Sequence, residues 1–283
     1  MSHAGSDAEV AAALSRLSLT PVVPDAVPSL GHKAARVDDA PPKAAVQAAT
    51  EVLLTRLSAL QDALHADRRK AVLLVLQGRD ASGKDGVIRT VCGAFNPGGV
   101  QVASFGPPTD RELSHDYLWR VHQVMPPRGV IGVFNRSHYE DVLVVRVRGL
   151  VPEERWRQRY AQINAFEQML SENDVVIRKC FLHVSRDEQQ ARLQERLDDP
   201  TKNWKFRLGD LDDRARWDDY TAAYQEVLAR CSTAVAPWYV VPADSKTVRN
   251  YLIAKLLVET IEALQPSYPP MDPAVREAAR GFQ

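Results

Sequence analysis

The stretch from Ala71 to Arg89 constrains the fold of this chain more than any other feature, because it joins an apolar run to a glycine-bounded loop. It reads Ala-Val-Leu-Leu-Val-Leu-Gln-Gly-Arg-Asp-Ala-Ser-Gly-Lys-Asp-Gly-Val-Ile-Arg. The apolar run predicts a buried strand, and the spacing of Gly78, Gly83 and Lys84 matches a phosphate-binding loop that opens a helix. Backbone N–H groups of such a loop surround a phosphate, and the lysine reaches its oxygens. We therefore predict phosphate or nucleotide contacts from Gly78, Ala81, Ser82, Gly83, Lys84, Asp85 and Gly86.

Two carboxylates accompany this loop and predict a metal ion. Asp85 stands where such loops usually have a serine or threonine that binds Mg²⁺, and Asp80 lies inside the loop. Carboxylates beside a phosphate are unfavourable unless cations lie between them. We therefore expect Mg²⁺, with Mn²⁺ as the alternative ion. The competing interpretation is a tight glycine-rich turn that binds no ligand.

Alternating apolar and helical segments predict an α/β fold of the P-loop type, with a mostly parallel five-stranded sheet between two layers of helices. The expected strands lie within residues 71–76, 100–105, 130–134, 175–184 and 237–241. The expected helices are residues 44–66, 86–95, 109–122, 151–171, 187–197, 212–230 and 245–264. Together they form one domain over residues 43–265. Prolines are expected to keep residues 1–42 as an extended or partly disordered arm, and residues 266–283 form a proline-rich tail.

Polar residues follow the third expected strand, at the sheet edge where ligands bind in such folds. The segment Asn135-Arg-Ser-His-Tyr-Glu-Asp141 offers a guanidinium fork for phosphate and carboxylates for a metal or a nucleotide. We predict that Arg136 contacts phosphate and that Asn135, Glu140 and Asp141 contact the nucleotide or its metal. An ordinary helix start capped by Asn135 is the alternative, and both interpretations can hold together.

A charged segment at about residues 190–212 is predicted to form a helical lid. Asp198-Asp-Pro-Thr-Lys-Asn-Trp-Lys-Phe-Arg207 interrupts a helical pattern with a loop that carries basic and aromatic side chains. A mobile cationic lid excludes water during phosphoryl transfer. The competing interpretation is a solvated charged face. The predicted lid cations are Arg192, Arg196, Lys202 and Lys205.

The overall charge excludes a general attraction to polyanions, since 36 Lys and Arg residues balance 36 Asp and Glu residues. No nucleic-acid partner is expected, and a basic site has to be built locally. Cys92, Cys180 and Cys231 form no metal or disulfide motif, which suits a reducing cytoplasm. The sequence shows no apolar run of about 18 residues and no signal pattern, so we expect a cytoplasmic protein without a membrane partner.

Five motifs in a fixed order make the chain similar to the second family of polyphosphate kinases, the P-loop polyphosphate:nucleotide phosphotransferases. The motifs are residues 78–86, 134–142, 199–205, 216–220 and 237–246, and the resemblance spans about residues 43–264. It implies a thymidylate-kinase-like fold, dependence on Mg²⁺ and a lid over a polyphosphate channel.

The resemblance also implies roles for individual residues. Asp80 matches the family's loop aspartate, Lys84 its phosphate-binding lysine and Arg136 the arginine after strand three, so these three are expected to be catalytic. The metal is expected on Asp80, Glu140 and Asp141. The Glu140-Asp141 pair, with an aspartate after the loop lysine, resembles the subgroup that phosphorylates both AMP and ADP. Many members have aspartate where this chain has an asparagine before Arg136, which leaves metal binding at that position unsupported.

The predicted reaction is the transfer of a terminal phosphate between inorganic polyphosphate and ADP or AMP, with ATP as the triphosphate. The acceptor phosphate is already an anion at neutral pH, so the reaction needs no general base, and catalysis consists of charge neutralisation and positioning. We also expect a homo-oligomer. The alternatives are an ATP-dependent nucleoside or nucleotide kinase, in which a carboxylate acts as base, and a nucleotide-binding protein without turnover.

Overall fold

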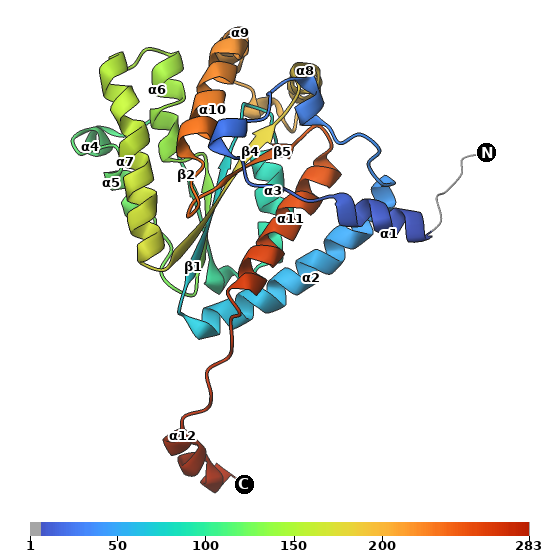
Figure 1. The fold of residues 1–283 in the computed structure, drawn as a ribbon, viewed down its shortest axis with the longest axis vertical. Helices are drawn as coiled ribbons and strands as arrows, with labels where there is room; N and C mark the ends of the chain where they lie inside the picture. The colour runs from blue at the N-terminus through green and yellow to red at the C-terminus, as the bar shows by residue number, and fades with distance from the viewer. Residues whose placement is uncertain (1–6, 283) are drawn as a thin grey trace.

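The computed structural model describes residues 7–282, which contain a five-stranded sheet with all neighbouring strands parallel (Figure 1). The strands are β1 (Ala71–Gln77), β2 (Val100–Ser104), β3 (Ile131–Asn135), β4 (Val175–His183) and β5 (Trp238–Pro242). Their spatial order is β2-β3-β1-β4-β5, so β1 lies at the centre. All carboxyl ends of a parallel sheet meet at one edge, which brings the segments after β1, β3 and β4 together.

Helices cover both faces of the sheet, and the residues of β1 show why. Helices α2 (Lys43–Asp67), α3 (Lys84–Thr90) and α11 (Lys246–Ala263) lie on one face, and α6 (Val144–Val147), α7 (Glu153–Glu172) and α10 (Trp217–Cys231) lie on the other. Val72, Leu74 and Leu76 pack in the first core, whereas Leu73 and Val75 pack in the second. Side chains alternate across a strand, so a strand that is apolar throughout requires both faces to be covered. The predicted three-layer fold is confirmed.

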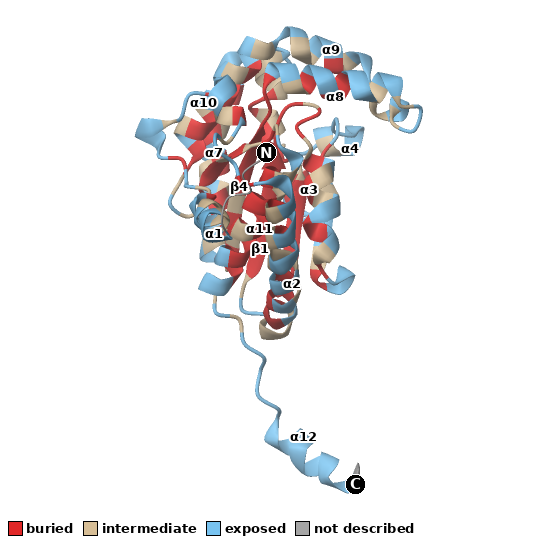
Figure 2. Cartoon of the chain, turned by 90° about the vertical axis from the view of Figure 1, so that its right-hand side faces the viewer, coloured by how far each residue is buried: buried red, intermediate tan, exposed pale blue. Residues whose placement is uncertain are grey.

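The lid helices lie across the carboxyl edge of the sheet. Helices α8 (Arg186–Asp198) and α9 (Leu208–Ala215) run over the top of the molecule in Figure 2, joined through a 3₁₀ turn at Asn203–Lys205. The link between β2 and β3 carries the short helices α4 (Asp110–Leu113) and α5 (Trp119–His122). Across residues 7–282, the structure has no helix with both the length and the apolar character needed to cross a membrane.

Two predicted helices are each broken in two. Residues 109–122 divide into α4 and α5, because the Asp116 side chain accepts a hydrogen bond from the Leu118 N–H at 3.0 Å and starts a new turn. The helix expected at residues 212–230 divides into α9 and α10 at Arg216, whose φ of −96° and ψ of 31° are not helical. The spacing of apolar residues did not reveal either break, because the residues on both sides of each break still form helices.

The N-terminal segment contains more regular structure than its prolines predicted. Helix α1 spans Asp7–Arg16, and 3₁₀ turns span Pro24–Ala26 and His32–Ala35. Val22 and Leu30 are buried, and the Val22 N–H donates to the Trp238 carbonyl of β5 at 2.8 Å. Helix α1 and this packing differ from the expected extended or partly disordered arm, because apolar residues between the prolines pack against the domain. Residues 1–6 of the predicted arm lie outside the described part.

The C-terminal segment ends in helix α12 (Pro273–Ala278), which is exposed. Figures 1 and 2 show this helix away from the body of the molecule. The predicted division into arm, domain and tail stays a prediction, because the position of a segment in the structure does not show whether that segment folds independently.

A buried network of charged groups ties the segment after β3 to β4. The Lys179 ammonium of β4 donates to Glu167 Oε2 at 2.5 Å, to Tyr139 Oη at 2.7 Å and to a backbone carbonyl of α10. His138 Nε2 lies 3.1 Å from Glu167 Oε1. All four side chains are at most 1% exposed, so these charges are stabilised by one another and not by water. The network holds the 3₁₀ turn His138–Asp141 against the sheet.

We expect Glu167→Gln to lower the free energy of unfolding by about 3–5 kcal/mol, because it leaves the Lys179 ammonium buried without a counter-charge. Urea unfolding followed by circular dichroism measures this change. Glu154→Gln, at an exposed position near the start of the same helix, is the control and should stay within about 0.5 kcal/mol. A loss below about 1 kcal/mol for Glu167→Gln would show that the network does not stabilise the fold.

Candidate phosphoryl-transfer site

The phosphate-binding loop depends on two glycines that leave no room for a side chain. A Cβ at Gly78 would meet the carbonyl oxygen of Leu182 at 2.7 Å. Gly83 has a φ of +99°, and a Cβ there would overlap the guanidinium of Arg249. Only glycine adopts this backbone at no steric cost. The loop can therefore pack between β4 and α11 only with glycine at both positions.

Lys84 lies inside the loop and is buried. Its ammonium donates to the Gly78 carbonyl at 2.7 Å and to the Arg79 carbonyl at 3.3 Å. Burial, followed by the charge of nearby Arg136, lowers the pKa of Lys84 to about 8. A cation that is desolvated and held only by neutral carbonyls gains energy when phosphate oxygens replace them. This position supports the predicted phosphate contact.

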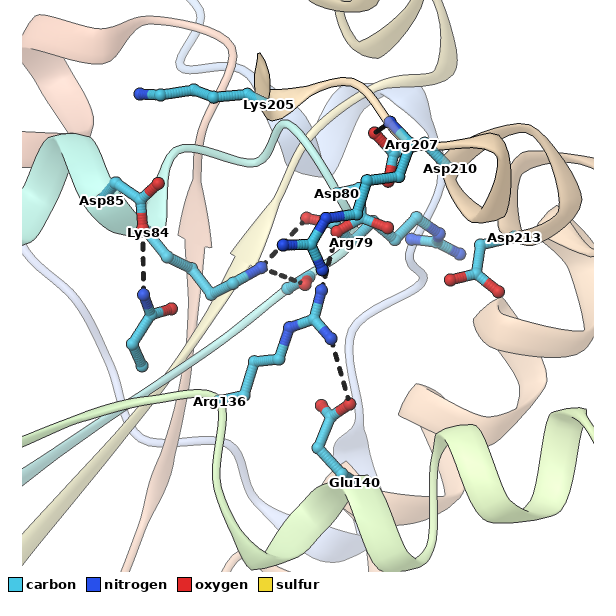
Figure 3. Close-up of polar contacts among 12 residues, drawn as sticks. Arg79, Asp80, Lys84, Asp85, Arg136, Glu140, Lys205, Arg207, Asp210 and Asp213 are labelled. Carbon is cyan, nitrogen blue, oxygen red and sulfur yellow. Dashed lines mark hydrogen bonds and ion pairs between the residues drawn. The ribbon is translucent and has the colours of Figure 1, made fainter. Parts of the chain in front are cut away.

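Arg136, Asp80 and Glu140 lie beside Lys84, as the sequence predicted. Arg136 Nη2 donates to Asp80 Oδ1 at 2.9 Å, and its Nη1 lies 3.7 Å from Glu140 Oε2 (Figure 3). Gln77 Nε2 donates to Glu140 Oε1 at 3.0 Å. Arg136 has a left-handed backbone with φ of +63°, which is uncommon outside glycine and clusters at functional sites. Its guanidinium is therefore fixed between two carboxylates from two segments.

Asp210 of α9 approaches Asp80 from the lid, a contact that the sequence did not predict. Burial, and then the charge of Asp80, raise the pKa of the Asp210 carboxyl above its usual value. Arg196 Nη1 lies 3.3 Å from Asp210 Oδ2, so the lid carboxylate is also oriented by a cation. Two crowded carboxylates are unfavourable alone, and they are the ligand type that a hard divalent cation prefers.

The predicted metal set is not brought together. Asp141 points elsewhere, since its Oδ1 accepts from Arg159 Nη1 at 2.9 Å, and burial raises its pKa. Over residues 7–282, the structure holds no group of three or more His, Cys, Asp or Glu side chains arranged for a metal. Asp80 and Asp210 nevertheless fit Mg²⁺, which usually keeps several waters and binds one or two carboxylates together with substrate phosphates.

Asn135, at the end of β3, and Asp85, just after the loop lysine, form a hydrogen bond with each other. Asn135 Nδ2 at the end of β3 donates to Asp85 Oδ1 in the first turn of α3 at 2.9 Å. Asp85 is thereby oriented along the helix start, and Asn135 is occupied as a donor. This contact links β3 to the phosphate loop.

A large basic cavity of about 440 Å³ lies between the phosphate loop and the lid. Its charged lining consists of Lys84, Arg89, Arg136, Arg192, Arg196, Lys202, Lys205, Arg207, Lys246 and Arg249, with Asp80, Asp85, Glu195 and Asp210. Ten cations face four carboxylates, a surplus of six positive charges in a chain with no net charge. Such a concentration of one sign attracts a polyanion strongly.

A second cavity lies against the same loop and shares Asp80 and Arg136 with the first. Its volume is about 30 Å³, close to that of one water, so it has to widen before it admits a nucleotide. Aromatic, aliphatic and charged groups are combined in its wall. The lining residues are Gly78, Arg79, Asp80, Arg136, Glu140, Leu143, Val144, Gln189, Asp213, Tyr220 and Tyr224.

Three of the four predicted lid cations have protein partners, Arg192, Lys202 and Arg196. Arg192 is buried, and its guanidinium donates to the carbonyls of Ala81 at 2.9 Å and Ala243 at 2.7 Å. It therefore braces the phosphate loop against the segment after β5, and its predicted contact with polyphosphate stays a prediction. Lys202 forms ion pairs of 2.7 Å with Glu195 and with Asp199.

Arg196 and Lys205 also line the basic cavity. Arg196 pairs with Asp210, next to Asp80. Lys205 has no carboxylate partner among the residues that the structure describes, and Figure 3 shows it extended on the lid side of Lys84. It is the predicted lid cation that is most available to an anionic ligand.

Sequence reasoning missed several charged residues of the site, including Arg79, Arg207, Asp210, Lys246 and Arg249. Arg79 lies within the phosphate-loop motif, and that position was the signal available for it. Asp210 lies inside the predicted lid, where only cations were considered. Arg249 belongs to α11, and its contact with Gly83 depends on how that helix packs.

Comparison with known proteins identifies the family. Residues 41–269 match the model of the family described as Polyphosphate kinase 2. The chain is 55% identical over 227 residues to an AMP/ADP-polyphosphate phosphotransferase of Meiothermus ruber, covering 80% of this chain and 85% of the relative. It is 47% identical over 234 residues to an ADP-polyphosphate phosphotransferase of Rhodopseudomonas palustris, covering 78% and 81%.

A solved structure agrees with these sequence relatives. The crystal structure of polyphosphate kinase 2 from Arthrobacter aurescens TC1 superposes with a TM-score of 0.84 at 39% identity, covering 94% of this chain and 99% of that one. The family model and the relatives each span most of the chain, and the fold agrees over nearly all of it. The chain therefore belongs to the Polyphosphate kinase 2 family.

Proposed function

We propose that this protein transfers a terminal phosphate between inorganic polyphosphate and ADP or AMP, with ATP as the product from ADP. The observation that carries the proposal is the pair of cavities that meet at Asp80 and Arg136. The basic cavity suits a polymer that carries about one negative charge per phosphate and no base. The smaller cavity, with its aromatic wall, is assigned to the acceptor nucleotide and has to widen when the nucleotide binds. The names of the two sequence relatives support these substrates.

The protein's contribution to the reaction is positioning and charge neutralisation. Lys84 lies in the phosphate loop and Arg136 lies between the cavities, so both can bind oxygens of the phosphoryl group as it is transferred. The acceptor phosphate is an anion at neutral pH and attacks without a general base. Holding two polyanions in line is the difficult step, and fixed cations between them lower its barrier.

The proposed metal is Mg²⁺, with Mn²⁺ as a substitute, on Asp80 and Asp210. When bound, it would neutralise charge on the polyphosphate donor and on the phosphate of the acceptor nucleotide. Asp80 is held by Arg136 and Asp210 by Arg196, so each carboxylate is oriented by a separate cation. Asp210 belongs to the lid helix α9, so this pair of ligands also joins the lid to the phosphate loop.

We include both AMP and ADP as acceptors, as well as a cytoplasmic location and a homo-oligomeric state, in the proposal. Glu140 lines the smaller cavity and belongs to the motif that resembles the dual-acceptor subgroup.

The three cysteines are free and buried, which suits a reducing compartment. Trp119, Phe166 and Met169 line a surface groove that offers apolar area to a second copy.

With ADP, long-chain polyphosphate and Mg²⁺ as the only phosphate-containing reactants, the protein should form ATP. With AMP in place of ADP, it should form ADP first and ATP later. Chromatography of the nucleotides over time measures both, with chelation of the metal as the control that stops the reaction. Activity that requires an added nucleoside triphosphate donor would replace the proposal by an ATP-dependent kinase. Conversion of ADP but not AMP would restrict it to a single acceptor.

Lys84→Met should lower turnover by about 10²–10³-fold, the usual loss for one electrostatic group at a reacting phosphate. It should not lower the melting temperature of the ligand-free protein at pH 7. The pKa of Lys84 is about 8 in the folded protein and 10.5 when exposed, so its positive charge destabilises the fold below pH 8, and stability rises between pH 8 and 10.5.

Lys70→Met is the matched control for this variant. Lys70 precedes β1 at the opposite end of the strand and pairs with Asp174 at 2.7 Å. Turnover by the Lys70→Met variant should stay within about twofold of that of the parent. Turnover within threefold of the parent for Lys84→Met at saturating Mg²⁺ would remove Lys84 from the proposed mechanism.

Lys205→Gln should raise the Michaelis constant for long polyphosphate several-fold and leave that for ADP within about twofold. It should also reduce the slope of log affinity against log salt by about 0.7, the value for one lost phosphate contact on a single-stranded polyanion. Lys202→Gln is the control, because two carboxylates already neutralise that lysine. Identical constants for both variants and the parent would mean that this part of the lid is a solvated face.

A further inference from the structure

Side chains from outside the phosphate loop hold the carbonyl groups of the loop. Gln189 Nε2 of α8 donates to the Asp80 carbonyl at 3.0 Å. Arg192 Nη1 of the same helix donates to the Ala81 carbonyl at 2.9 Å and to the Ser82 carbonyl at 3.2 Å. Three successive carbonyls of the loop are therefore bound by one helix of the lid.

Arg249 of α11 donates to one of the same carbonyls. Its Nη1 lies 3.3 Å from the Ser82 carbonyl oxygen, while its Nε and Nη2 donate to Asn250 Oδ1 at 3.2 Å and 2.9 Å. The guanidinium also lies against Gly83, where a Cβ would overlap it. The peptide between Ser82 and Gly83 is therefore held on its carbonyl side by two guanidinium groups, from α8 and from α11.

This pair of cations is unfavourable for the ligand-free protein. Arg192 pairs with Glu188 at 2.8 Å, whereas Arg249 is 2% exposed and has no carboxylate partner within residues 7–282. Burial, followed by the charge of Arg192, lowers the pKa of Arg249 to about 10. A buried charge without a counter-charge costs stability, so stability alone does not explain the contact. An anion bound at the loop offsets the charge.

Holding the Ser82 carbonyl also fixes the N–H of the next residue. A trans peptide is planar, and its C=O and N–H point in opposite directions. The described chain has no cis peptide, so the Gly83 N–H points away from the two guanidinium groups. Neither this N–H nor that of Ala81 has an acceptor in the part of the chain that the structure describes, and both residues line the basic cavity. Loop N–H groups without protein acceptors are suited to bind phosphate oxygens.

We propose that Arg192 and Arg249 are positioning residues, which hold the Ser82 carbonyl so that the Gly83 N–H donates to the phosphoryl group as it is transferred. This assignment rests on the proposed function. Neither arginine has to touch the reacting atoms, because each acts through the peptide. A donor that is oriented before the substrate arrives needs no reorganisation during the reaction, so its effect appears mainly in kcat. Because Arg192 belongs to α8, the lid takes part in orienting the loop.

Arg249→Met removes one of the two cations and keeps much of the side chain's volume. We expect kcat to fall at least about tenfold, while either Michaelis constant changes less than about threefold. The melting temperature of the ligand-free protein should fall by no more than about 4 °C. Arg249→Lys retains a charged donor and should recover part of the lost kcat. Lys255→Met is the matched control, because this cation of α11 donates to the Leu17 carbonyl at 2.9 Å, and kcat should not change.

The Gly83 amide can be observed by itself, because Ser82-Gly83 is the only serine–glycine pair in the sequence. Cell-free synthesis with ¹³C-carbonyl serine and ¹⁵N-glycine gives one carbonyl-selected amide signal in an NMR spectrum. Adding tripolyphosphate and Mg²⁺ should move this signal downfield in the parent and in Lys255→Met, because the N–H then donates to a phosphate oxygen. In Arg249→Met the signal should move less far, because one of the groups that orient the peptide is missing.

A kcat within twofold of the parent for Arg249→Met would overturn the inference. A rise confined to the Michaelis constant for polyphosphate would overturn it too, since Arg249 would then be a donor-binding residue. If the variants do not fold, the parent decides, because a Gly83 signal that tripolyphosphate does not move would contradict the proposal. Failure of the proposed function is a separate result, in which the parent itself makes no ATP from polyphosphate and ADP.

Discussion

Concentrated positive charge at the carboxyl edge of the sheet is the constraint on which the rest of this structure depends. Lys84, Arg136 and Arg79 come from two loops that meet there, and neighbouring like charges repel one another unless something offsets them. The loop's own carbonyls offset the Lys84 charge, and Asp80 and Glu140 offset that of Arg136. The fold thus holds cations in place before substrate arrives, which is what phosphoryl transfer between two phosphates requires.

Buried polar contacts behind the site hold these cations and carboxylates in place. The turn that carries Glu140 is anchored by His138 and Tyr139 in the buried network with Glu167 and Lys179. On the other side of the loop, Arg192 joins it to the segment after β5 through backbone carbonyls. Charged residues next to the site therefore serve two purposes. Some face the cavities. Others are buried, where they pair with one another in place of water and keep the cavity-facing side chains in position.

Much of the fold and part of the site could be predicted from the sequence. The five strands and the phosphate loop were predicted correctly, because each rests on local patterns of apolar residues and glycine spacing. Arg136 was placed beside Asp80 because parallel strands end at a common edge. The breaks within helices, the packed N-terminal segment and the orientation of Asp141 toward Arg159 were missed. Each of these depends on a single side-chain contact or on burial against a distant segment.

The sequence by itself determined the sheet, the loop and the chemical class of the site. These features follow from short-range spacing, which the backbone geometry of strands and glycine turns converts directly into structure. Only the tertiary structure decided which charges are available to a ligand. In the sequence, Arg192 and Arg79 are both arginines near the phosphate loop. In the structure, Glu188 and backbone carbonyls bind all the donor nitrogens of Arg192, whereas Nε and Nη1 of Arg79 have no partner among the described residues. Which partner a charged side chain finds depends on contacts between segments that lie more than a hundred residues apart in the sequence. No local sequence pattern predicts such a contact.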